Sequence, residues 1–93
     1  MNNAEARELL TQHLTPYRAL AYDELLGRVG RVETAELTGR SGQTYQIEVT
    51  VMRDVGSGPA LLVIGAIDDG GWRAFRPLTE DFLVAPGGQP SAE

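Results

Sequence analysis

The sequence has no cysteine, no lysine and only one histidine, His13. Without cysteine, the chain has no disulfide framework, no thiolate nucleophile and no cysteine-based zinc site. It also has no run of 18 apolar residues and no apolar segment of the signal-peptide type, which predicts a soluble, cytoplasmic protein. All eight basic residues are arginine, and we interpret this as a bias in composition rather than as chemistry.

Positive charge is scarce and is not clustered. The net charge is −5; residues 1–40 hold five arginines and six acidic residues, whereas residues 41–93 hold three arginines and seven acidic residues. Nucleic acids and anionic membranes are bound through clustered positive charge. We therefore expect neither of them as the main partner.

The length and composition predict one globular domain. The chain has 93 residues, of which 42% are hydrophobic and 23% are charged, and these values are typical of a protein with a single core. The last seven residues are one alanine together with glycine, proline and polar residues. We predict a single domain over residues 1–86 and a disordered tail over residues 87–93.

The first residues have the pattern of a helix. Asn2 or Asn3 is a candidate N-cap, because a short polar side chain can accept a hydrogen bond from the first helical turn. Ala6, Leu10 and Leu14 then recur at every fourth position, which places them on one face of a helix.

A proline interrupts this pattern. The residue before a proline disfavours the helical conformation, so we expect a break near Pro16. A second short helix is predicted over residues 22–26, and Gly27 is a natural stop for it. From residue 31 the period changes to two, and residues 32–37 are predicted to form a strand.

The clearest alternation in the chain lies within residues 44–51. One face is apolar and the other is polar, which is typical of an antiparallel sheet that is covered by helices on one side only. The apolar face consists of Tyr45, Ile47, Val49 and Val51, and the polar face of Thr44, Gln46, Glu48 and Thr50.

The longest apolar run is followed by an Asp-Gly pair. Such a pair between apolar β-formers is typical of a hairpin, because a type I′ turn needs positive φ at both central residues. We therefore predict a hairpin of residues 61–67 and 72–76 about the turn Asp69–Gly70. In this register Ile67 lies opposite Trp72.

The two predicted strands of this hairpin differ in pattern. Residues 61–67 are apolar on both faces, as in a central strand. The register pairs Gly65 with Ala74 and Ile64 with Phe75. Because the second strand alternates, either Trp72 or Phe75 faces the core, but not both.

The order of these elements predicts an α+β fold. We expect a two-layer domain in which an N-terminal helix, broken near Pro16, packs on one face of a four-stranded antiparallel meander. Residues 82–84 are a candidate for a short edge strand. The layout is analogous to that of cystatin and monellin, and an analogy of fold carries no function.

One segment resembles a known group of proteins. The stretch Ile67–Phe82, IDDGGWRAFRPLTEDF, together with Tyr22–Leu25, is similar to a group of small uncharacterised bacterial α+β domains. The resemblance implies a bacterial origin. It implies no activity and supplies no catalytic residues.

The acidic pairs and the histidine do not form a catalytic pattern. Asp68 and Asp69 are adjacent in a predicted turn, where neighbouring side chains diverge, so we interpret them as turn residues rather than metal ligands. Glu80 and Asp81 follow the far end of the predicted hairpin, roughly 15 Å away. His13 lies beside the apolar face of the first helix, where a partly buried histidine is common. We expect no catalytic residue, no metal and no cofactor.

Aromatic and arginine residues follow the predicted turn. Tryptophan and arginine are over-represented at binding hot spots, and an apolar patch on a monomer often marks a contact surface. If Phe75 faces the core, Trp72 and Ile67 form an apolar pair on the open face of the sheet. If Trp72 faces the core, Arg76 lies at its rim. The candidate interaction residues are Trp72, Ile67, Arg73, Arg76 and Met52.

These features leave three functions open. The leading hypothesis is a non-enzymatic interaction module that binds another protein, or itself, through the open face or an edge strand. The second is an enzyme or small-ligand-binding protein with a pocket between helix and sheet, involving His13, Tyr17, Tyr45 or the pair Asp68–Asp69. The third is an acidic inhibitor or immunity-type protein that covers a basic partner, suggested by the charge of residues 41–93.

Overall fold

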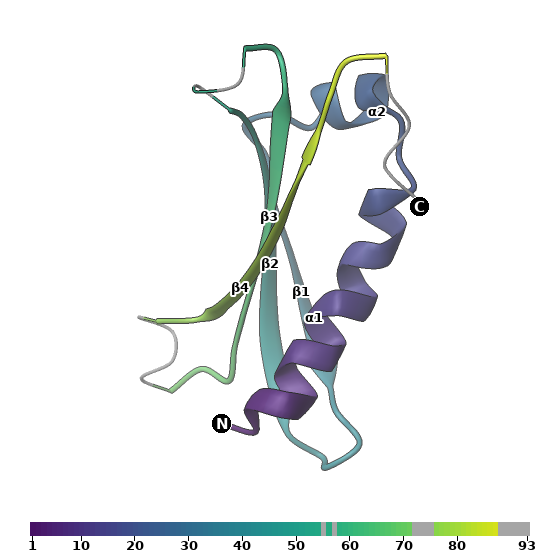
Figure 1. Cartoon of the computed structure of the whole chain (residues 1–93). Coiled ribbons are helices and arrows are strands. Elements are labelled where there is room, and N and C mark those ends of the chain that lie inside the picture. Colours follow the sequence, from purple (N-terminus) through teal and green to yellow (C-terminus); the bar gives the residue numbers. More distant parts are fainter. Residues whose placement is uncertain (55, 57, 72–75, 88–93) are drawn as a thin grey trace.

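The chain forms two helices followed by four strands. The computed structural model describes residues 1–54, 56, 58–71 and 76–87. Consecutive strands pair antiparallel in the order β1-β2-β3-β4, and α1 lies along one face of this sheet (Figure 1). The predicted α+β architecture is confirmed. The elements are α1 (Asn3–Arg18), α2 (Tyr22–Leu26), β1 (Val32–Thr38), β2 (Thr44–Arg53), β3 (Leu61–Asp68) and β4 (Leu78–Val84).

Helix α1 begins as the sequence predicts. Asn2 is the N-cap, and its side-chain oxygen accepts a hydrogen bond from the backbone N–H of Glu5 at 3.1 Å. The side chains of Ala6, Leu10 and Leu14 are fully buried. The regular spacing of these residues therefore decides which face of α1 covers the sheet.

The predicted break near Pro16 is wrong. Helix α1 continues through Pro16 to Arg18 and ends at Ala19, whose backbone N–H donates to the carbonyl of Pro16. A proline costs a helix one hydrogen bond and a clash with the preceding turn. Here it stands in the last turn, and Tyr17 and Arg18 contact the edge strands, which holds that turn in place. The predicted second helix is confirmed as α2, with Gly27 as its C-cap.

The predicted faces of β2 are also confirmed. The residues on its apolar face are at most 3% exposed, and they pack with α1, α2, β3 and β4 into one core. The alternation in the sequence predicted these faces correctly because one face of β2 is buried in the core and the other is exposed to solvent. The buried residues of β2 are Tyr45, Ile47, Val49 and Val51.

The predicted hairpin is wrong in its second strand. The partner of β3 is β4, and in this register Ile67 pairs with Leu78 and Ile64 with Asp81. The candidate edge strand at residues 82–84 is thus the end of a seven-residue strand. Residues 72–75, which include Trp72 and Phe75, lie outside the described part of the chain, so the question of which of the two faces the core stays open.

The chemistry of the Asp-Gly segment explains this difference. The side chain of Asp68 accepts a hydrogen bond from the N–H of Gly70 at 2.7 Å, and that of Asp69 accepts from Gly71 at 3.2 Å. Gly70 has a positive φ of 85°. In both cases an aspartate side chain accepts from the backbone N–H two residues later, as in an Asx turn. These turns begin the connection between β3 and β4, residues 69–77, which replaces the predicted two-residue turn. Asp69 is thus a turn residue as predicted, whereas Asp68 is the last residue of β3 and contributes its side chain to the turn.

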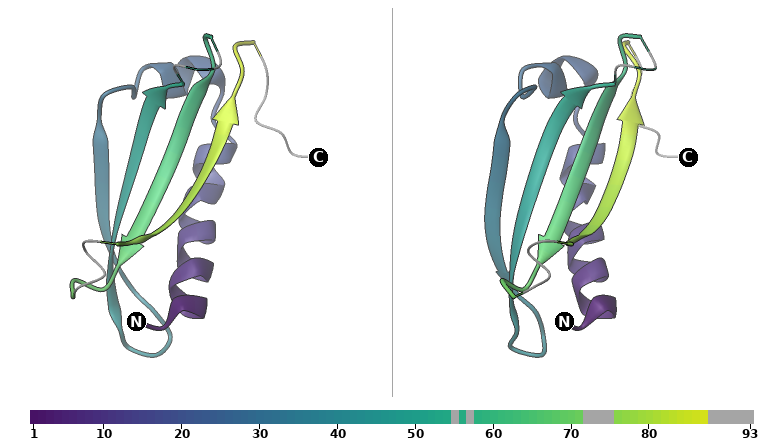
Figure 2. Two further views of the ribbon diagram at one scale, coloured as in Figure 1. Left: turned by 60° about the vertical axis from the view of Figure 1, so that its left-hand side comes forward. Right: turned by 90° about the vertical axis from the view of Figure 1, so that its left-hand side faces the viewer.

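Both helices lie on the same side of the sheet. The two views in Figure 2 show the four strands side by side, with α1 behind them and no helix in front. No helix within the described ranges is long and apolar enough to cross a membrane. Of the predicted tail, residues 88–93 lie outside the described part of the chain.

Candidate functional site

The face of the sheet turned away from the helices carries a group of apolar side chains. Strand register places Met52, Leu62 and Leu83 in one row across β2, β3 and β4. The next row contains Ile64 of β3 and ends at Val32 of β1. We call this set, made up of Val32, Met52, Leu62, Ile64 and Leu83, the apolar corner.

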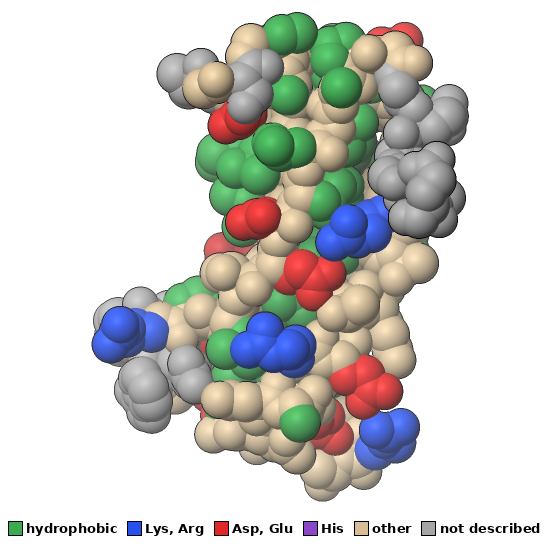
Figure 3. Space-filling view, viewed as in Figure 1, with side chains coloured by type: hydrophobic (Ala, Val, Ile, Leu, Met, Phe, Trp, Pro, Cys, Tyr) green, Lys and Arg blue, Asp and Glu red, His purple; other side chains and the backbone are tan. Residues whose placement is uncertain are grey.

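Several side chains of the apolar corner are open to solvent. Val32 is 58% exposed, Leu83 is 55% exposed and Met52 is 40% exposed, whereas Leu62 and Ile64 are half-buried. These three are the exposed large hydrophobic residues of the described chain. Figure 3 shows hydrophobic side chains gathered at the upper left, on the side of the sheet opposite α1.

The rest of this face is polar and acidic. Strand register places four carboxylates on it, and none of the strand residues that share the face is basic. Within the described residues none of the four takes part in an ion pair. Two of them accept hydrogen bonds from uncharged groups: Glu36 from the side chain of Gln46 at 3.1 Å, and Asp68 from the backbone N–H of Gly70 at 2.7 Å. The four are Glu36, Glu48, Asp68 and Asp81.

On the opposite face, toward the helices, the acidic side chains of the edge strands have hydrogen-bond and ion-pair partners. Glu33 of β1 faces the helices and accepts hydrogen bonds from the hydroxyl of Tyr17 and from the guanidinium of Arg28, the latter at 3.0 Å. The hydrogen bond from Tyr17, together with the positive charge of Arg28, lowers the pKa of Glu33. Burial and the bond to Glu33 raise the pKa of Tyr17 to about 12.

The other edge of the sheet has a matching contact. Glu80 of β4 accepts hydrogen bonds from the hydroxyl of Thr11 at 2.6 Å and from Arg18 at 3.2 Å. The guanidinium of Arg18 also lies over the ring of Phe82, 4.3 Å from its centroid. Helix α1 is therefore hydrogen-bonded to both edge strands, to β1 through Glu33 and to β4 through Glu80.

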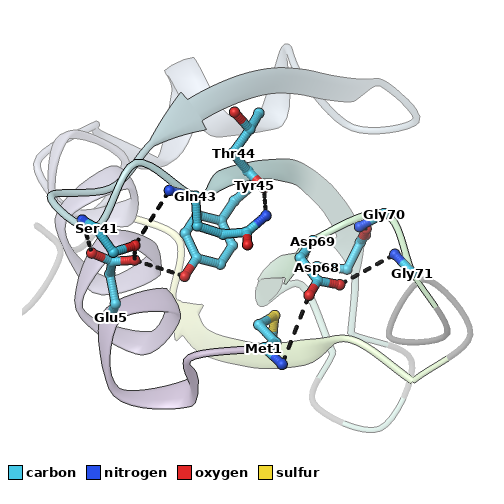
Figure 4. Close-up of polar contacts among 10 residues, drawn as sticks. All are labelled: Met1, Glu5, Ser41, Gln43, Thr44, Tyr45, Asp68, Asp69, Gly70 and Gly71. Carbon is cyan, nitrogen blue, oxygen red and sulfur yellow. Dashed lines mark hydrogen bonds and ion pairs between the residues drawn. The ribbon is translucent and has the colours of Figure 1, made fainter.

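A third carboxylate joins the start of α1 to the β1–β2 connection (Figure 4). Glu5 accepts hydrogen bonds from the backbone N–H and hydroxyl of Ser41 at 2.9 and 2.6 Å, and from the hydroxyl of Tyr45 at 2.8 Å. The bonds from Ser41 are the main cause of a lowered pKa at Glu5. Burial, and then the bond to Glu5, raise the pKa of Tyr45 to about 12.

The candidate interaction residues fall in different places. Met52 lies on the open face as expected, whereas Ile67 is fully buried on the face toward the helices. The expectation that Ile67 contributes to an open surface is therefore wrong, because its register aligns it with Ile47 in the core. Arg76 is exposed. Trp72 and Arg73 lie outside the described residues.

The candidate pocket residues do not converge. Tyr45 bonds to the first turn of α1 and Tyr17 lies in the last turn, roughly 18 Å away along the helix. The ring of His13 lies 6.2 Å from that of Tyr17. The carboxylate of Asp69 lies 3.8 Å from the backbone amine of Met1.

Two small surface hollows flank α1. One, of about 170 Å³, is lined by Pro16, Tyr17, Leu20 and Arg28. The other, of about 110 Å³, adjoins Glu5 and Arg40. Both are smaller than the few hundred Å³ of a typical ligand pocket. Within the described ranges no three potential metal ligands lie together.

Sequence reasoning missed most of the apolar corner and both edge contacts. A usable signal existed for the edge contacts: Glu33 shares its face of β1 with Leu37, and Glu80 shares its face of β4 with Phe82. A carboxylate in a core-facing register needs a partner, because burying an unpaired charge is costly. No comparable signal placed Leu83 on the open face, because the sequence analysis paired residues 61–67 with residues 72–76 and not with β4.

Comparison of the chain with models of known families, with curated proteins and with solved structures finds no match. The class of protein is therefore defined by the structure itself. It is a small two-layer α+β domain in which both helices cover one face of the sheet, and neither helix covers the other face, which is apolar and acidic.

Proposed function

We propose that this protein is a non-enzymatic interaction module that binds another polypeptide through the open face of its sheet. The observation that carries the proposal is the row Met52, Leu62 and Leu83, which neither helix covers. Apolar patches on a monomer often mark contact surfaces. As the sequence predicts, we place this module in the bacterial cytoplasm, with neither nucleic acid nor membrane as its main partner.

The strand that supplies the patch supports this proposal. The half of β3 that faces away from the helices carries Leu62, Ile64 and Ala66. An isolated domain gains little by placing apolar side chains on a solvated face. Complete burial of an exposed leucine or methionine contributes about 1.5–3 kcal/mol. A partner that covers this face therefore gains hydrophobic stabilisation that folding alone does not provide.

Substitutions in the apolar corner test the proposal. Leu83→Ser and Met52→Ser remove exposed side chains, so the free energy of unfolding should change by less than about 0.5 kcal/mol. Ala4→Ser on the exposed side of α1 is the control. Light scattering after size exclusion measures self-association, and pull-down from the source cell measures retention of a partner.

We expect both serine variants to weaken association about tenfold while Ala4→Ser leaves it unchanged. Trp72→Ala, in the same assays, tests the contribution of the residues outside the described part. A strict monomer that retains the same proteins with and without Leu83→Ser contradicts the proposal.

A further inference from the structure

We infer that the occupant of the open face is a basic amphipathic polypeptide segment, with apolar anchors for the apolar corner and lysine or arginine side chains for the carboxylates beside it. The inference rests on the proposed function and names the chemistry of the partner.

The distribution of ion pairs separates the two faces of the sheet. On the helical side, Glu5, Glu33 and Glu80 all accept hydrogen bonds that tie α1 to the sheet or to its turn. On the open face none of the four carboxylates is in an ion pair within the described residues, and no basic strand residue shares that face. Within the described residues, the strands of the open face therefore present no basic side chain and four carboxylates that form no ion pair.

The carboxylates lie close enough to the apolar corner for one partner to meet both. Asp81 is directly opposite Ile64 and two positions from Leu83. Glu48 pairs with Ala66 across the same face. Neighbouring side chains of this kind are about 5–7 Å apart. A segment that presents leucine-like and lysine-like side chains a turn apart matches this spacing.

A second copy of the chain fits the face less well. Four strands of about seven residues make a face of roughly 20 by 25 Å, and a flat contact of this size buries about 500 Å² per copy, below the roughly 800 Å² per partner of a stable interface. Facing copies would also set carboxylates against carboxylates. Charge complementarity favours a basic partner, because it steers association and disfavours like charges.

A synthetic peptide tests this inference on the full chain. The probe is a helix-forming peptide of leucine and lysine, about 15 residues and so about 22 Å long, which matches the face. A peptide with glutamate in place of lysine is the control. Backbone amide shifts locate the site, and fluorescence anisotropy measures affinity at increasing salt.

We expect the lysine peptide to shift amides of β2, β3 and β4 on the open face and to bind less tightly as salt screens the charges. Leu83→Ser should weaken binding about tenfold. Glu48→Gln should weaken it roughly two- to fivefold. Asp23→Asn, an equal change of charge on the exposed side of α2, should leave it unchanged.

The inference is overturned if the glutamate peptide binds equally well, if Glu48→Gln and Asp23→Asn have the same effect, or if the shifts map to α1. The same experiments distinguish failure of this inference from failure of the proposed function. If the chain self-associates in a manner sensitive to Leu83→Ser but ignores the lysine peptide, the interaction face stands and the basic partner is wrong. If Leu83→Ser affects neither kind of binding, both are wrong.

Discussion

Gly65 lies directly beneath Leu14, so closely that a Cβ at position 65 would be 3.0 Å from both δ-carbons of the leucine. The same Cβ would be 2.9 Å from a δ-carbon of Leu10. Both leucines are fully buried. Helix α1 can therefore approach β3 this closely only because position 65 has no side chain.

Gly65→Ala is expected to destabilise the fold. The added methyl group overpacks the contact with Leu14, which typically costs about 1–3 kcal/mol. Urea unfolding measures the change. Gly56→Ala is a matched control, since a Cβ at position 56 meets nothing within 4 Å, and it should change the free energy of unfolding little.

A double substitution checks that the cost arises at this contact. Leu14→Ala alone should cost about 2–5 kcal/mol by leaving a cavity. Combined with Gly65→Ala, the loss should be smaller than the sum, because the methyl group then enters space that the leucine has left. Strict additivity would show that the two residues do not oppose each other.

Acid should weaken the ties between α1 and the sheet. The pKa values of Glu5 and Glu33 are lowered from their ordinary value of 4.5 by hydrogen bonds and nearby arginine. The unfolded chain therefore binds more protons than the folded chain in this range. The stabilisation is present above pH 4.5 and is lost as pH falls through the lowered values.

Glu5→Gln tests the acid dependence. The stability difference between the wild type and this variant should be largest at neutral pH and should shrink below pH 4.5. Glu48→Gln changes the charge equally on the open face, where no hydrogen bond to α1 is lost. A constant difference for Glu5→Gln across the acid range would refute the assignment.

Alkali should destabilise the protein through two tyrosines. Burial and a carboxylate partner raise the pKa of Tyr17 and of Tyr45 from 10.0 to about 12. Between these values the folded state keeps protons that the unfolded state has released, so the free energy of unfolding falls as pH rises from 10 to 12. Phenolate absorbance should show both residues titrating late.

The tyrosine assignment has a built-in control. Tyr17→Phe and Tyr45→Phe together should flatten the alkaline slope, at a cost of about 1 kcal/mol for each lost hydrogen bond at neutral pH. Tyr22→Phe also removes a hydroxyl that donates a hydrogen bond, to the carbonyl of Pro59. An equally flattened slope in Tyr22→Phe would contradict the prediction.

Glu80→Gln should loosen the C-terminal half of α1 from β4. The residue pairs with a partly exposed Arg18, so we expect a loss below about 1 kcal/mol. Hydrogen exchange should be faster at the end of α1 and in β4, while β1 remains protected. Arg7→Gln, on an exposed position of the same helix, is the control.

The sequence predicts those elements whose pattern reports a local environment. The spacing of Ala6, Leu10 and Leu14, the Asn2 cap and the alternation of β2 each arise because one face is dry and the other is wet. Such patterns persist whatever the distant partners are. The helix nevertheless ran past Pro16, because contacts with the edge strands support its last turn.

By itself, then, the sequence determined the class of fold, the two helices, and the first three strands with the faces of β2. The tertiary structure alone decided that β4 pairs with β3, that Ile67 is core, and which face stays open beneath Leu83. Pairing across a nine-residue connection depends on long-range contacts, and residues on both sides of the Asp-Gly turn are apolar enough to form a strand. Which carboxylates meet an arginine is likewise a matter of spatial proximity, and the linear order of residues does not contain it.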